Sequence, residues 1–110
     1  MIKVYTAPQI CKDCRKLEKL IEKRNLQVER VNIIENTANL KTYLAYRDIS
    51  LDFIPVKEEG KIGIPFFERE NGTITFNVNE ALYWMHQPPL EAGELEDDEE
   101  EACDACSLKY

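Results

Sequence analysis

Two short strand-like stretches, separated by one run of helical length, restrict how the first third of the chain folds. Residues 2–6 (IKVYT) and residues 26–34 (LQVERVNII) are rich in β-branched and aromatic side chains, which favour strands. Between them, apolar residues recur at helical spacing over residues 12–24, and Asn25 closes that run. Strands joined through a helix lie parallel, with a right-handed crossover. The sequence therefore predicts an N-terminal β-α-β unit.

A second helix is expected after Asn36 or Thr37, either of which is a suitable N-cap. One face of that helix carries Leu40, Tyr43, Leu44 and Arg47. Residues 48–64 contain one proline and two glycines, and we expect a loop there.

The clearest local signal is Asn71-Gly72, which lies between the β-rich runs PFFERE and TITF. This dipeptide is typical of a two-residue hairpin turn in which both residues have positive φ. Asn79 is a candidate cap for a last helix at 80–86. The predicted fold class is thus α/β, with the order β-α-β-α-β-β-α and a four-stranded mixed sheet flanked by helices.

Charge is distributed unevenly along the 110 residues. Residues 1–90 carry 13 Lys and Arg against 12 Asp and Glu, whereas residues 91–110 carry nine acids and one lysine. We expect one domain at 1–90 and an acidic, flexible tail at 91–110. An acidic tail and a domain without basic excess argue against nucleic acid as a partner, and no apolar run is long enough to span a membrane. Because no signal sequence is visible, we expect a cytoplasmic protein.

The first of two Cys-x-x-Cys pairs, Cys11 and Cys14, falls between the first strand and the first helix in the stretch ICKDCRK. A helix N-terminus and nearby cations such as Lys12 stabilise a thiolate, so we expect a lowered pKa at Cys11, the more exposed of the pair. Two intervening residues allow Cys14 to attack a mixed disulfide formed at Cys11. The pattern predicts a nucleophile with a resolving thiol.

The second pair, Cys103 and Cys106, follows the acidic stretch. These cysteines are either an accessory dithiol that exchanges with the first pair or adventitious members of a solubilising tail. All four thiols together are also a conceivable ligand set for zinc or an iron–sulfur cluster. A purely structural disulfide is less expected, because the cytoplasm keeps thiols reduced.

The stretches VYTAPQICKDCRK, KEEGKIGIPFF and NGTITF together resemble the glutaredoxin branch of the thioredoxin-like superfamily, in particular small bacterial glutaredoxin-related proteins. The resemblance covers about residues 1–86. It implies a thiol–disulfide oxidoreductase with Cys11 as nucleophile and Cys14 as resolving thiol. Such an enzyme acts on a protein or small-molecule disulfide without a cofactor, and its reductant is glutathione or a flavoprotein reductase.

The same resemblance implies that the Ile64–Pro65 bond is cis and that Ile64 and Pro65 contact the substrate. Lys12, between the cysteines, is a further candidate for substrate binding. An extended substrate would pair with the backbone there as an added strand. The chain departs from the family in having Lys12-Asp13 between the cysteines and Asn77-Val78 at the usual Gly-Gly pair, where Val78 would crowd glutathione.

An alternative function is a redox-sensing or metal-binding interaction protein. The first cysteine stretch is also similar to arsenate-reductase-like proteins, which include such regulators. Those proteins place an arginine beside the proline, whereas Gly63 and Ile64 stand before Pro65 here.

Overall fold

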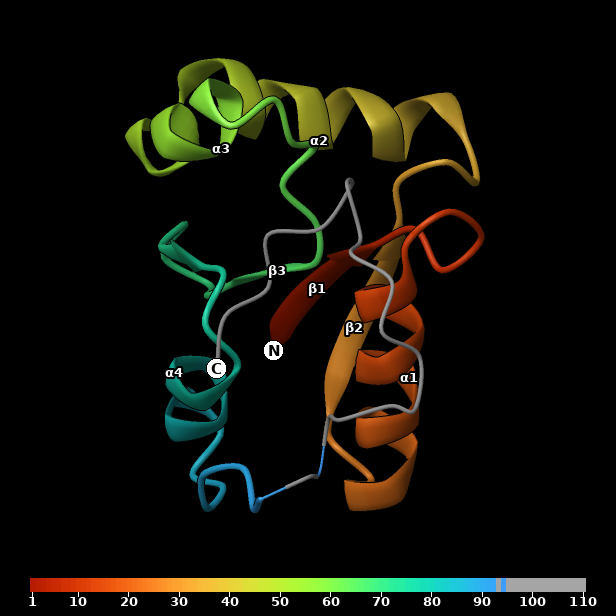
Figure 1. Ribbon diagram of the computed structural model, residues 1–110, viewed down its shortest axis with the longest axis vertical. Coiled ribbons are helices and arrows are strands. Elements are labelled where there is room, and N and C mark those ends of the chain that lie inside the picture. Colours follow the sequence, from red (N-terminus) through yellow and green to blue (C-terminus); the bar gives the residue numbers. More distant parts are fainter. Residues whose placement is uncertain (93, 95–110) are drawn as a thin grey trace.

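A mixed four-stranded sheet with the order β2-β1-β3-β4 forms the middle of the molecule in the computed structural model, which describes residues 1–92 and 94 (Figure 1). The strands are β1 (Ile2–Thr6), β2 (Val28–Asn32), β3 (Phe66–Glu68) and β4 (Ile74–Thr75). Strand β1 pairs in parallel with β2 and antiparallel with β3, which pairs antiparallel with β4. The predicted α/β class and the four-stranded mixed sheet are therefore confirmed.

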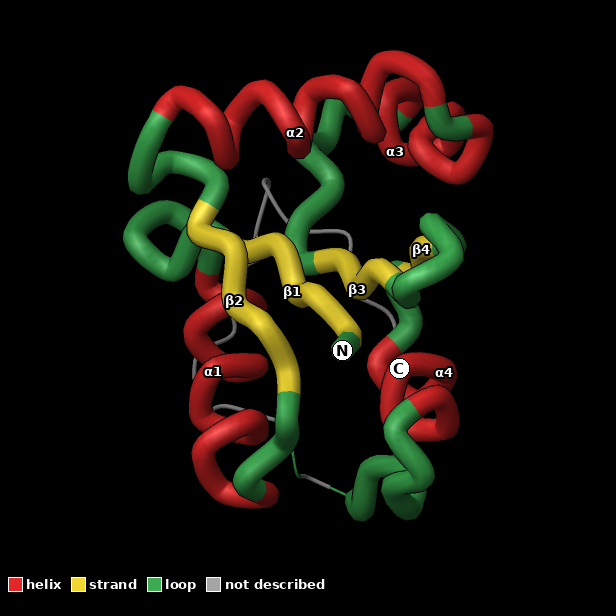
Figure 2. The backbone as a smooth tube through the Cα atoms, turned by 180° about the vertical axis from the view of Figure 1, so that it is seen from behind, coloured by secondary structure: helices red, strands yellow, loops and turns green. Residues whose placement is uncertain are grey.

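Helices lie on both faces of this sheet (Figures 1 and 2). They are α1 (Lys12–Arg24), α2 (Thr37–Ile49), α3 (Ile54–Glu58) and α4 (Val78–Trp84), with a short 3-10 turn at Leu51–Phe53 before α3. Helices α2 and α3 pack on one face, whereas α1 and α4 pack on the other. None of these described helices is long and apolar enough to cross a membrane.

Alternation along the two central strands divides the core into two clusters. Tyr5 of β1 and Phe66 of β3 stack with 4.5 Å between ring centroids and face α2 and α3. Their neighbours Val4 and Phe67 face α1 and α4 instead. This follows from the two-residue period of a strand, and each fully buried side chain of this size contributes about 1.5–3 kcal/mol.

Helix α1 follows the sequence prediction at both ends. Cys11 is its N-cap, and Asn25 closes it in the left-handed conformation with φ 51°. The apolar residues at helical spacing, Leu17, Leu20 and Ile21, are buried against the sheet. Asparagine tolerates left-handed backbone better than other non-glycine residues, which explains why the helix ends there.

The expectation of a loop over residues 48–64 is wrong in part, because this segment contains the 3-10 turn and α3. Pro55 lies at the start of α3, where a helix needs no backbone donor. A proline that suggests a break in the sequence is therefore compatible with a helix start.

The hairpin between β3 and β4 forms at the predicted place with a different turn. Only Gly72 has positive φ, at 88°, whereas positive φ was expected at Asn71 as well. The Arg69 amide donates to the Thr73 carbonyl, which leaves a loop of three residues, and the Gly72 amide donates to Arg69. Three-residue hairpins need left-handed backbone only at their last position.

Helix α4 begins two residues earlier than expected. Asn77, rather than Asn79, caps it by accepting a hydrogen bond of 3.0 Å from the Glu80 amide. The side chain of Asn79 instead accepts a hydrogen bond from the Leu90 amide at 2.8 Å. Two Asn residues, two positions apart, are both candidate caps, and only the tertiary contact of the second distinguishes them.

Candidate functional site

A tight turn after β1 places Cys11 at the start of α1. The carbonyl of Ala7 accepts hydrogen bonds from the amides of Ile10 and Cys11, at 3.0 and 2.9 Å. The guanidinium of Arg15 donates to the carbonyl of Pro8 at 2.8 Å. The loop is therefore fastened to the first turn of the helix that it precedes.

The sulfur of Cys11 takes the position that an N-cap side chain normally occupies. Its Sγ accepts a hydrogen bond from the Cys14 amide at 3.3 Å, and the backbone of Cys11 is extended. The first amides of a helix have no intrahelical acceptor, and they carry the positive end of the helix dipole. This arrangement favours negative charge on the Cys11 sulfur when it is released as a thiolate.

The two cysteines of the motif are in different chemical states. Cys11 is disulfide-bonded, whereas Cys14 carries a free thiol. They are thus not bonded to each other. Both side chains have an exposed fraction of 0% in this state, so the predicted greater exposure of Cys11 is wrong for the disulfide-bonded form.

Burial raises the pKa of the Cys14 thiol to about 12. The nearby carboxylates of Asp13 and Glu18 contribute to this increase, whereas the Ala7 amide, 3.5 Å from the sulfur, opposes it. Cys14 is therefore a neutral thiol at physiological pH, which suits a group that acts only after Cys11 has reacted.

The Ile64–Pro65 segment lies against the cysteine turn. The Ile64 carbonyl oxygen is 3.9 Å from the Sγ of Cys11, and the bond between Ile64 and Pro65 is cis. The expected cis proline is thus confirmed. The structure brings together Cys11, Cys14 and this dipeptide, and Lys12 follows directly as the first residue of α1.

Sequence reasoning missed the side chains that hold this segment from α2. The hydroxyl of Tyr43 donates to the Ile62 carbonyl, and the guanidinium of Arg47 donates to the Lys61 carbonyl at 3.2 Å. The sequence feature that could have indicated these contacts is the shared helical face of Tyr43 and Arg47. A tyrosine on a buried helix face needs a hydrogen-bond partner for its hydroxyl group.

Gly63 allows the same segment to pass close to the core. Its φ is 91°, and an added Cβ would lie 2.6 Å from Cε2 of Phe53. Position 63, directly before Ile64, therefore requires glycine for two reasons, the positive φ and the close contact with Phe53.

Two exposed apolar side chains, Ile10 and Ile34, lie at the same end of the β1–β2 pair, with exposed fractions of 53% and 44%.

The predicted accessory residues, Cys103 and Cys106, lie outside the described residues. Within residues 1–92 and 94, no group of three or more His, Cys, Asp or Glu side chains is arranged to hold a metal ion.

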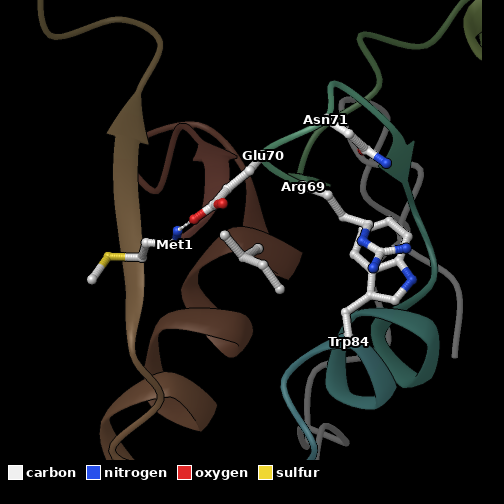
Figure 3. A pocket seen from close by; sticks show the side chains of 6 residues that line it. Met1, Arg69, Glu70, Asn71 and Trp84 are labelled. Carbon is white, nitrogen blue, oxygen red and sulfur yellow. Dashed lines mark hydrogen bonds and ion pairs between the residues drawn. The ribbon is translucent and has the colours of Figure 1, made fainter.

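A surface pocket of about 290 Å³ lies at the other end of β1 (Figure 3). The guanidinium of Arg69 covers the ring of Trp84 at 4.9 Å, and the N-terminal amine of Met1 pairs with Glu70. The lining residues are Met1, Ile2, Arg69, Glu70, Asn71 and Trp84. Because β1 runs from this pocket toward Cys11, the pocket is separate from the cysteine site.

Comparison with known proteins adds no assignment to this geometry. No protein-family model, curated protein or solved structure matches the chain. The chemistry of the site therefore has to follow from its own residues and their arrangement.

Proposed function

We propose that this chain is a thiol–disulfide oxidoreductase of thioredoxin-like, glutaredoxin-related fold. The observation that carries the proposal is the position of Cys11, whose sulfur caps α1 and lies 3.9 Å from the carbonyl of Ile64. A thiolate at this position would be stabilised by the helix amides. It would also lie beside the Ile64 backbone, where the substrate disulfide is proposed to dock.

In the reduced protein, the Cys11 thiolate attacks one sulfur of a substrate disulfide, and the other sulfur leaves as a thiolate. Cys14 then loses its proton and attacks Cys11 in the mixed disulfide, which releases the second substrate thiol. Two electrons pass to the substrate, and a Cys11–Cys14 disulfide remains. The raised pKa of Cys14 keeps its thiol protonated until the first step has taken place.

The backbone before Pro65 is the proposed docking edge for substrate. An extended peptide or glutathione would align beside Ile64, with Lys12 and the exposed Ile10 at the flank of the reacting sulfur. Lys12 would attract acidic groups, and Ile10 would contact apolar ones.

Glutathione or a flavoprotein reductase is the proposed source of electrons, and the chemistry needs no other cofactor. The expected obstacle to glutathione was the side chain of Val78. That side chain is 1% exposed and packs in the core cluster of α1 and α4. Its methyl groups are therefore turned away from the surface where glutathione would bind.

Turnover of a disulfide by the full-length chain tests the proposal. Cys11→Ser should abolish reduction of a protein disulfide coupled to a thiol reductant, while Cys14→Ser should retain reduction of glutathione mixed disulfides only. Tyr83→Phe, at a side chain that is 79% exposed on α4, is a control expected to keep full activity. Persistent turnover by Cys11→Ser would refute the assignment, and a single oxidation without turnover would indicate a redox sensor instead.

A further inference from the structure

The pocket at the start of β1 contains a guanidinium that is held in position without a hydrogen bond. Arg69 follows β3, and its Cζ lies 4.9 Å from the centroid of the Trp84 ring on α4. Stacking on an aromatic ring orients a guanidinium and leaves the N–H donors along its edge available. Among residues 1–92 and 94, no carboxylate or carbonyl accepts a hydrogen bond from this side chain.

The carboxylate next to Arg69 in the chain is engaged elsewhere. Glu70 pairs with the N-terminal amine of Met1, and Figure 3 shows its side chain directed toward Met1, whereas Arg69 and Asn71 lie on the side of Trp84. The charges of Glu70 and the amine compensate each other. The lining of this pocket therefore has one uncompensated positive charge, on Arg69.

A second donor borders the same pocket. The side-chain oxygen of Asn71 accepts a hydrogen bond from the Thr73 amide at 3.0 Å, which leaves the NH₂ group of the carboxamide as a donor. Arg69 and Asn71 both belong to the turn between β3 and β4, so their spacing is fixed by the hairpin. Two donors and no free acceptor among these side chains favour a ligand that accepts hydrogen bonds.

The pocket also has an apolar wall. Ile2 and Trp84 are partly buried and pack against the core cluster under α1 and α4. The volume of the pocket, about 290 Å³, is at the lower end of the range for small-molecule sites, which is about 300–1,000 Å³. A ligand here would be a small molecule with an apolar part.

An adjoining pocket of about 340 Å³ shares three lining residues with the first but differs in charge. In the rest of its lining, Nζ of Lys3 lies 3.9 Å from a carboxylate oxygen of Glu29. Glu68, which also lines it, accepts a hydrogen bond from the hydroxyl of Tyr5 at 2.6 Å. Because these groups are already paired, the uncompensated charge is available on the Trp84 side.

We propose that the Arg69–Trp84 pocket binds a small organic monocarboxylate, with the carboxylate on Arg69 and the apolar body against Trp84 and Ile2. A guanidinium binds a carboxylate through two parallel hydrogen bonds, and a stacked guanidinium loses less conformational entropy when they form. One uncompensated positive charge, with the carboxylate of Glu70 close by, favours a monoanion over a doubly charged phosphate.

This binding site goes beyond the proposed oxidoreductase function and does not depend on it. None of the residues that line the pocket belongs to the cysteine site, which lies at the other end of β1. Turnover of a substrate disulfide should therefore be unchanged in Arg69→Gln, whatever its effect on the pocket.

Fluorescence of Trp84 provides a direct test, because it is the only tryptophan of the chain. The full-length protein is titrated with benzoate, which combines a carboxylate with an apolar ring. Three further probes separate the contributions: acetate has the carboxylate without the ring, benzyl alcohol has the ring without the charge, and inorganic phosphate has a higher charge.

Benzoate should give a saturable change in the fluorescence, with a Kd of about 1 mM or below. Each of the other three probes should bind at least tenfold more weakly. No saturable change with benzoate would overturn the proposal. Equal binding of benzyl alcohol would refute the carboxylate contact, and tighter binding of phosphate would refute the preference for a monoanion.

Two variants of Arg69 and a matched control assign the contact. Arg69→Gln should weaken benzoate binding about tenfold or more, and Arg69→Lys should give a smaller loss, because lysine keeps the charge without the planar pair of donors. Lys41→Gln removes a positive charge at an exposed position on α2 and should leave the Kd unchanged. Equal affinities of Arg69→Gln and Lys41→Gln for benzoate would refute the role of Arg69.

A peptide C-terminus offers the same chemistry as a free organic acid, and a further titration distinguishes the two sources. The probe is a tripeptide that ends in phenylalanine, used as the free acid and as the C-terminal amide. Binding of the free acid alone would extend the proposal to peptide C-termini, whereas binding of benzoate but neither peptide would confine it to free acids. Equal binding of the peptide acid and its amide would contradict recognition of a carboxylate.

Discussion

Gly63→Ala should destabilise the protein more than a change of one methyl group suggests. Gly63 has φ 91°, a conformation that costs an L-residue about 1–2 kcal/mol. The new Cβ would also lie 2.6 Å from Cε2 of Phe53 and 3.0 Å from Cγ1 of Val56. Overpacking of this kind costs about 1–3 kcal/mol, so the expected loss is about 2–5 kcal/mol in total.

The close contact is strongly destabilising because the surrounding core prevents the Phe53 ring from shifting. It is fully buried, and its ring meets those of Phe66 and Phe76 edge-on, with centroids 5.4 and 5.1 Å apart. Relief must therefore come from the backbone of Gly63 itself, which would shift Ile64 relative to Cys11. We expect weaker disulfide exchange with substrate in addition to lower stability.

Gly60→Ala separates the two effects. Gly60 has φ 72°, and nothing lies within 4 Å of its Cβ position. Gly60→Ala should lower the free energy of unfolding only through the unfavourable backbone conformation, by about 1–2 kcal/mol. The effect of alanine on the unfolded chain is common to both variants. Urea unfolding of both at one pH gives the difference, and equal losses would refute the close contact between Gly63 and Phe53.

Three further predictions concern other contacts. Because the pKa of Cys14 is about 12, its alkylation at pH 8 should be about 10³-fold slower in the folded protein, with the Cys11 disulfide intact, than in urea. The alkylation rate should rise with pH up to about 12. A fast reaction that does not depend on pH would contradict this. Hydrogen bonds from the Arg24 guanidinium lower the pKa of Glu94 to about 2, so Glu94→Gln should cost about 1 kcal/mol at pH 7, and the difference from the unaltered protein should vanish as pH falls from 4.5 to about 2; urea unfolding at several pH values measures this. Phe53→Ala should cost about 3–5 kcal/mol in the same assay, and a loss below 1 kcal/mol would mean that the ring is not a core element.

The parts of the fold that the sequence predicts are those fixed by local chemistry. The apolar spacing of α1, its closure at Asn25 and the turn at Gly72 depend on residues that are near one another in the chain. The location of Cys11 at a helix start follows from the same local pattern. Local rules misjudged Pro55, because a proline ends a helix in one position and begins one in another.

The contacts between distant parts of the chain, at the site and elsewhere, could not be predicted from local patterns. Arg24 and Glu94 are 70 residues apart, and Cys11 and Ile64 are 53 apart. No spacing rule connects such residues. The roles of Asn77 and Asn79 also depended on whether Leu90 returns to α4.

The central place of β1 has a consequence for how the chain is made. One neighbour, β2, ends at Asn32 and leaves the ribosome early, whereas the other, β3, ends at Glu68. At 5–20 residues per second, translation of the 36 residues between them takes about 2–7 s. During that interval the N-terminal β-α-β unit has an open sheet edge on its future middle strand. This edge is the part of the nascent chain most exposed to pairing with another strand, and chaperone protection is most needed there.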